Sequence, residues 1–186
     1  MKTTVMFISV AVIAALAPAA DANPLPASAE RAAERAAPTS YLQVGAAAGA
    51  DPRLLFAAVT VAVGANVPGT PLWVRATVGT GGAQEGLDHS DVRRGRYMMA
   101  RAGAEARLPI GTSRRAAVVA GLDVGVGSIH YTDAMAGSDT SLVIAGAVGV
   151  DLGGRHLRFR PGFEVSSDVL TEIRGAALTA AVAWTW

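Results

Sequence analysis

Cysteine is absent from the sequence of 186 residues, and lysine occurs only once, at Lys2. Without cysteine the chain can form neither disulfides nor thiolate metal sites. The formal net charge is +1, whereas nucleic-acid binding needs a concentrated basic face, so we expect no nucleic-acid partner. The sequence also lacks a glycine-rich nucleotide loop, a set of four metal ligands and a nucleophile elbow, and we therefore expect no cofactor.

The amino terminus has the pattern of a secretory signal peptide. Lys2 precedes an apolar run over Val5–Leu16, and Ala20-Asp21-Ala22 offers a small-x-small cleavage site. The run is shorter than the roughly 20 apolar residues that a spanning helix needs. We therefore expect a cleaved signal peptide over residues 1–22, export across the inner membrane and a flexible tail over residues 23–40. An uncleaved membrane anchor is the alternative.

The last residues, Arg174–Trp186, alternate with a period of two. One parity carries Leu178, Val182, Trp184 and Trp186, and the other carries small and weakly polar side chains. This alternation predicts a β-strand with one apolar face. A strand that ends on an aromatic residue resembles the C-terminal strand of bacterial outer-membrane β-barrels. The resemblance implies that Trp184 and Trp186 form an assembly signal for the barrel-assembly machinery.

Alternation punctuated by glycine continues through the whole of residues 41–186 and predicts eight strands. They are Tyr41–Gly49, Leu54–Asn66, Leu72–Gly81, Arg96–Leu108, Arg115–Ser128, Thr140–Leu152, His156–Ser166 and Ile173–Trp186. Their lengths are near the 9–11 residues with which a tilted strand crosses a bilayer, and short connections alternate with longer ones. We expect the first and last strands to pair, because pairing removes both open sheet edges. The first strand, rich in glycine and alanine, is the weak point of that closure.

The pattern as a whole resembles the small outer-membrane barrels of the OmpA and OmpX kind. The resemblance implies an all-β fold, an eight-stranded antiparallel up-and-down transmembrane barrel, over residues 41–186. It also implies a monomer in the bacterial outer membrane, in contact with membrane lipid and lipopolysaccharide. Its role would be structural or one of surface interaction, with a lumen filled by side chains rather than a large pore.

The two faces of the strands differ in strand after strand. One is large and apolar, while the other mixes glycine and alanine with a few charges. A soluble, lipocalin-like periplasmic binder would turn the charged face to water. That face should then be rich in lysine, glutamate, threonine and serine, but the chain has one lysine in total, so we favour a lipid-facing apolar exterior. The lumen then holds five arginines and four acids: Arg75, Arg101, Arg107, Arg158 and Arg160, with Glu105, Asp123, Asp151 and Glu164. Their near balance predicts ion pairs, because unpaired buried charges cost several kcal/mol each.

Local features sharpen this expectation. A two-residue turn at Gly154-Arg155 would place Asp151 opposite Arg158 and predicts an ion pair between them. Pro161 removes a ladder donor and predicts a bulge or a break in pairing. Parity turns Trp73 inward, unless a bulge near Pro71 turns it to the lipid interface.

The expected outer loops hold the candidate reactive groups, in Gly86–Asp91 and Ser128–Asp133. Some small outer-membrane barrels are lipid A deacylases, with a serine, a histidine and an acid on the lipid-facing wall. His89 directly precedes Ser90, however, which departs from the His-x-Ser arrangement of those enzymes. A lipid-modifying hydrolase, or a cation site at Asp88, His89 and Asp91, therefore remains an alternative, and we expect no catalytic and no metal-binding residue.

Three arginines, Arg93, Arg94 and Arg96, lie where the fourth expected strand would meet the outer leaflet. Guanidinium groups suit bidentate contacts with phosphate, so these residues are candidates for binding lipopolysaccharide phosphates. The alternative is an interfacial position at the barrel rim without a specific ligand. His130 and Tyr131 are expected to be interfacial in the same way.

Overall fold

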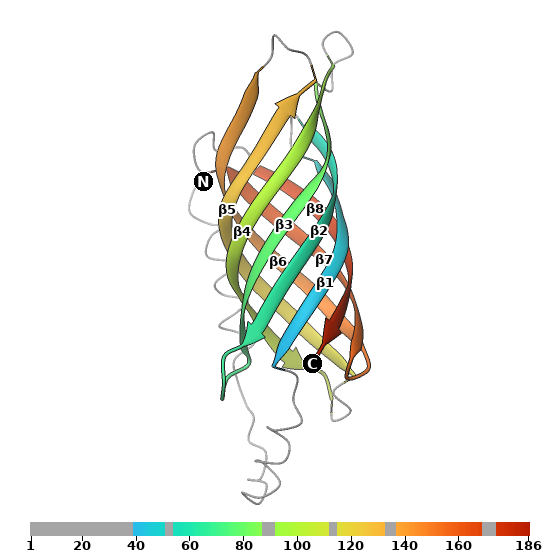
Figure 1. Ribbon diagram of the computed structural model, residues 1–186. Coiled ribbons are helices and arrows are strands. Elements are labelled where there is room, and N and C mark those ends of the chain that lie inside the picture. Colours follow the sequence, from blue (N-terminus) through green and yellow to red (C-terminus); the bar gives the residue numbers. More distant parts are fainter. Residues whose placement is uncertain (1–38, 51–53, 87–91, 112–114, 133–136, 169–173) are drawn as a thin grey trace, which may run out of the picture.

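The computed structural model describes residues 39–50, 54–86, 92–111, 115–132, 137–168 and 174–186 (Figure 1). The expected signal peptide and the expected tail lie outside the described residues except for Thr39 and Ser40, and Ser40 is the first residue of β1. Eight strands form a closed barrel in which each strand pairs antiparallel with the next and β8 pairs with β1. The bounds are β1 Ser40–Ala50, β2 Leu54–Asn66, β3 Leu72–Glu85, β4 Arg93–Pro109, β5 Ala116–Tyr131, β6 Ser138–Gly153, β7 Leu157–Asp168 and β8 Arg174–Thr185. The predicted all-β, eight-stranded antiparallel barrel is confirmed.

The two ends of the barrel differ. At the turn end, where β1 begins and β8 ends, β2 connects to β3 and β6 to β7 through a few residues. At the loop end, β4, β5 and β6 extend beyond the other strands (Figure 1). β3 continues to Glu85, which pairs with Arg93 of β4, so both ends of the loop expected over Gly82–Gly95 are strand. The placement of His130 in an outer loop is also wrong, because β5 and its pairing with β4 continue beyond Ser128, the expected end of the strand, to Tyr131.

The seam between β1 and β8 is fully paired, from Tyr41 opposite Thr185 to Ala50 opposite Ala176. The backbone of Trp186 extends it, since Trp186 N donates to Ser40 O at 3.1 Å. A Cβ atom at Gly49 would lie 2.8 Å from the ring of Phe56. The predicted closure is confirmed, and the missing side chain at Gly49 leaves room for Ala176 and Ala177 of β8 and for the ring of Phe56 on β2.

Large apolar side chains cover the outside of the barrel. Leu178 is 71% exposed, and Val59, Val78 and Trp184 are each more than half exposed. The nine expected lumen charges point inward among glycines and alanines, so the arrangement is the reverse of a lipocalin-like barrel, whose apolar face encloses a ligand. On β5 the apolar outward positions run from Val118 to Val126, and nine residues at a tilt of about 40° span roughly 23 Å, close to the apolar band of membrane barrels. Within the described ranges, no helix is long and apolar enough to cross a membrane.

The pairing of β6 with β7 departs from the expected register by two residues. Gly153 pairs with Arg158, because Gly153 has a positive φ of 143° and the N–H of Gly154 donates to Leu157 O, which closes a wider turn. The register derived from a two-residue turn is therefore wrong.

Pro161 interrupts this ladder. Pairing is continuous up to Gly149 opposite Gly162 and resumes at Leu152 opposite Phe159, with the same register on both sides. The predicted break is confirmed and is not a bulge. Trp73 is buried and points into the lumen, as parity predicts, so no bulge turns it outward.

Candidate functional site

The nine charged residues expected in the lumen come from β3, β4, β5, β6 and β7, and the structure joins all of them in ion pairs. Seven of them form one network near the turn end: Arg75, Glu105, Arg107, Asp123, Asp151, Arg158 and Arg160. The other two, Arg101 and Glu164, form a separate pair at 2.7 Å. The period-two pattern of the strands places all nine side chains on one face of the sheet.

Glu105 is the centre of the network. Its carboxylate receives ion pairs from Arg75 at 3.0 Å, Arg107 at 2.7 Å and Arg160 at 3.0 Å, and its side chain has no exposed surface. The arginine side chains are themselves only 8–12% exposed. One carboxylate therefore compensates three buried guanidinium groups, each of which also pairs with Asp123 or Asp151.

Asp151 joins two arginines of β7 to the network. Arg158 Nε lies 3.0 Å from Asp151 Oδ1, so the predicted contact is present although the register that suggested it is wrong. Arg160, at the position opposite Asp151 in the observed register, lies 3.2 Å from Asp151 Oδ2. Arg160 thus bridges Asp151 and Glu105.

Two aromatic rings close the lumen at the turn end. The rings of Tyr41 and Trp73 lie 5.6 Å apart, and the Arg107 guanidinium carbon is 4.4 Å from the Tyr41 centroid and 3.9 Å from the Trp73 centroid. Both rings are almost fully buried. Cation–π contacts of this kind strengthen when the cation is desolvated. The sequence pattern places Trp73 in the lumen but gives no sign that Arg107 lies over both rings.

The loop end of the lumen is more open. A cavity of about 360 Å³ is lined by residues that include Glu85, Tyr97, Tyr131 and Glu164. Tyr131 donates a hydrogen bond to Glu85 at 2.8 Å across this space. Next to the charge network the free volume falls to about 70 Å³. The lumen is thus a pocket that narrows toward the turn end, with the network as its floor.

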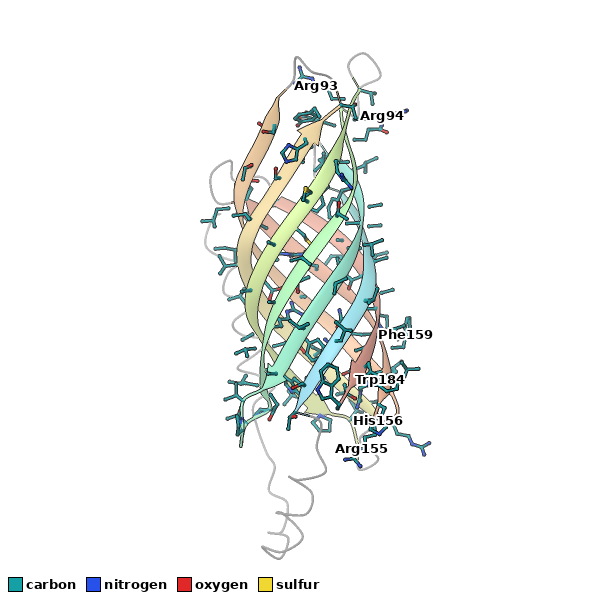
Figure 2. All side chains as sticks on the ribbon, in the orientation of Figure 1. Arg93, Arg94, Arg155, His156, Phe159 and Trp184 are labelled. Atoms are coloured by element: carbon teal, nitrogen blue, oxygen red, sulfur yellow. The ribbon has the colours of Figure 1, made fainter. Side chains whose placement is uncertain are left out.

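At the loop end, the outward face of β4 changes from apolar to basic. Ala100 and Met98 point outward, and Arg96 and Arg94 follow at the same parity, while Arg93 has the opposite parity. Figure 2 shows Arg93 and Arg94 at the end of the barrel opposite Arg155, His156, Phe159 and Trp184. Arg96 pairs with His130 on β5. The three arginines therefore lie at one rim, two of them on the membrane side of the wall.

Aromatic side chains mark the other rim. Trp184 and Phe159 are about half exposed on the outside, and the ring of His156 stacks on Trp184 with centroids 6.1 Å apart (Figure 2). Trp186, two residues after Trp184, is also more than half exposed. Exposed aromatic rings at a strand end suit a membrane–water interface. The two residues expected to form the assembly signal thus lie on the lipid side of the turn end.

The candidates in the expected outer loops are only partly described. Asp88, His89, Ser90, Asp91 and Asp133 lie outside the described residues. Ser128 and His130 lie on the outward wall of β5, with Ser128 Oγ 3.2 Å from His130 Nε2. Tyr131 points into the lumen, contrary to its expected interfacial position. Over the described part of the chain, no group of three or more acidic or histidine side chains is placed to hold a metal ion.

The barrel has eight antiparallel strands, an apolar exterior and a closed lumen. These features together define the class of small outer-membrane barrels. Solved structures of that class are similar to this chain. Neisserial surface protein A has a TM-score of 0.59 at 14% identity, over 79% of this chain and 97% of that protein. Ail of Yersinia pestis, in complex with the heparin analogue sucrose octasulfate, has a TM-score of 0.55 at 10% identity, over 81% and 99%.

A major outer-membrane protein of Thermus thermophilus has a TM-score of 0.50 at 15% identity, over 79% of this chain and 99% of that protein. Neither a protein-family model nor a curated protein matches the sequence. The expected resemblance to outer-membrane barrels is confirmed for the fold, and the apolar exterior agrees with the expected outer-membrane location.

Proposed function

We propose that this chain is a monomeric outer-membrane barrel with a closed lumen, which interacts at the cell surface with lipopolysaccharide phosphates through its arginine rim. The observation that carries the proposal is the position of Arg94 and Arg96, which follow directly on the outward apolar positions of β4. Phosphates of an outer-leaflet lipid lie just beyond the hydrocarbon, at the depth of these two side chains. With the turn end in the periplasm, the arginine rim faces outward from the cell.

Three further features support the proposal. Guanidinium groups bind phosphate in bidentate geometry, and Arg94 and Arg96 have no carboxylate partner among the described ion pairs. Closure by β1 and β8 leaves no sheet edge for a second copy, which supports a monomer. The neighbour Ail is described in complex with a sulfated polyanion, so a barrel of this fold can bind dense negative charge.

The test is binding of lipopolysaccharide to the purified, folded barrel. We expect Arg94→Glu/Arg96→Glu to weaken binding at least about 10-fold, since each charge-assisted contact contributes roughly 1.5–3 kcal/mol. Arg155→Glu is the matched control, because Arg155 is exposed at the opposite rim (Figure 2). Undiminished binding by the double variant, or an equal loss in the control, would contradict a specific role of this rim.

A further inference from the structure

Three side chains on the outward wall of β5 and β6 form a hydrogen-bonded chain. Thr140 Oγ1 donates to Ser128 Oγ at 3.3 Å, and Ser128 Oγ lies 3.2 Å from His130 Nε2. With Thr140 as donor, the Ser128 hydroxyl is free to donate its own proton to the unprotonated Nε2. A serine whose proton points at a histidine nitrogen is the arrangement that activates a nucleophile.

The depth of this chain in the membrane is set by its neighbours. On three adjacent strands the outward face changes from apolar to polar at one level: between Met98 and Arg96 on β4, between Val126 and Ser128 on β5, and between Leu142 and Thr140 on β6. Cross-strand pairing joins Met98 to Ser128 and Ser128 to Thr140. Ser128 therefore lies at the boundary of the hydrocarbon, where the ester carbonyls of lipids are found, and not in it or far above it.

An apolar groove in the outer wall leads away from the pair toward the membrane centre. Ser128 and His130 line its polar end, and its other lining residues include Val59, Val78 and Val126. Arg96, at the position of β4 directly opposite His130, lies on the water side of the same wall. A lipid with its acyl chain in this groove and its phosphate at Arg96 would hold an ester bond beside Ser128.

We propose that Ser128 and His130 are a nucleophile and a general base that cleave an acyl ester of an anionic outer-leaflet lipid. Ser128 Oγ attacks the ester carbonyl carbon while His130 Nε2 takes the hydroxyl proton. The carbon–oxygen bond to the lipid breaks, and His130 returns that proton to the leaving alkoxide. Water then attacks the acyl-serine, giving its proton to His130 and on to Ser128 Oγ, which releases a fatty acid and restores the pair.

This activity goes beyond binding at the arginine rim but uses the headgroup contact of the proposed function at Arg96. Two substrate preparations identify the source of the ester, since both lipopolysaccharide and a glycerophospholipid carry acyl esters next to phosphate. We would incubate the folded full-length barrel with lipopolysaccharide micelles and, separately, with phosphatidylglycerol vesicles, and measure released fatty acid. Labelling with an alkyl fluorophosphonate, followed by peptide mapping, reports on the nucleophile independently of the substrate.

We expect acyl release from at least one preparation and a fluorophosphonate adduct on Ser128. Ser128→Ala and His130→Ala should each lower the rate at least about 100-fold, the range of nucleophilic and general-base effects. Ser138→Ala, on the same outward wall of β6, is the matched control and should retain the wild-type rate. Heat-modifiable migration in detergent verifies that each variant is folded.

Two results would overturn the assignment. One is a folded wild-type barrel that releases no acyl chain from either preparation and reacts with the probe no faster than Ser128→Ala. The other is activity that survives in Ser128→Ala. Binding of lipopolysaccharide, measured on the same samples, separates this failure from failure of the proposed function. A barrel that binds lipopolysaccharide but cleaves no ester would contradict the role of Ser128 and His130 and leave the proposed function intact.

Discussion

Replacing Glu105 by glutamine tests whether the charge network stabilises the barrel. The amide has nearly the shape of the carboxylate, so the change removes a charge with little change in packing. In the wild type Glu105 is paired with three arginines, Arg75, Arg107 and Arg160, at 2.7–3.0 Å. Without it, the seven-residue network holds four arginines and only two carboxylates, Asp123 and Asp151.

The magnitude follows from burial. Removing one partner of a buried ion pair costs about 3–5 kcal/mol because it leaves an uncompensated charge. Arg107 is the group most affected, since its remaining carboxylate, Asp151, is 3.7 Å away. We therefore expect Glu105→Gln to lower the free energy of unfolding by at least about 3 kcal/mol. Glu164→Gln is the matched control: Glu164 has one arginine partner and a side chain that is 14% exposed, so we expect a loss of about 1–2 kcal/mol.

The assay is reversible unfolding of the refolded barrel in phospholipid vesicles by urea, followed by tryptophan fluorescence. Trp73 lies inside and Trp184 outside, so the spectral change reports both the lumen and the lipid contact. A Glu105→Gln variant within about 1 kcal/mol of the wild type, or one no less stable than Glu164→Gln, would refute the reasoning. It would mean that water in the lumen, rather than Glu105, solvates the arginines.

Two further predictions concern other parts of the barrel. Gly64→Ala should destabilise it by about 1–3 kcal/mol, because a Cβ atom there would overlap the buried ring of Tyr41, whereas Gly82→Ala, whose Cβ meets nothing within 4 Å, should be nearly neutral in the same unfolding assay. Equal effects would contradict the packing of Tyr41 on Gly64. Trp186→Ala should change the unfolding free energy by no more than about 0.5 kcal/mol, since the side chain is 55% exposed and the seam uses its backbone. It should nevertheless reduce the amount of barrel assembled in cells several-fold, and full assembly, measured by heat-modifiable migration, would count against an assembly signal.

Much of the fold could be predicted from the period-two pattern. Alternation decides which face each residue joins without reference to distant parts of the chain, so the apolar exterior, the inward Trp73 and the nine lumen charges all follow from parity. Closure also follows, because the strand of Arg174–Trp186 needs a partner and Tyr41–Gly49 is the remaining edge.

Strand ends and contacts between distant strands could not be predicted in the same way. The polar residues after Ser128 suggested a loop, but backbone pairing with β4 and β6 continues to Tyr131 and His130 whatever the polarity of the side chains. The contact of Arg107 with the rings of Tyr41 and Trp73 joins three strands, and their relative shifts are set by the whole barrel. Ser128 and His130 became neighbours on one wall only once the strand extended through them.

The register of β6 and β7 shows why the lumen charges matter for specificity. A shift of two residues keeps every side chain on its own face, so lipid contact on the outside is the same in the expected and the observed registers. What changes is the partner inside. In the expected register Asp151 faces Arg158 and leaves Arg160 opposite Gly149; in the observed one Arg160 reaches both Asp151 and Glu105. Burial of the apolar exterior in lipid therefore does not favour one of the two registers over the other. The ion pairs of Arg160 with Asp151 and Glu105 do favour the observed one.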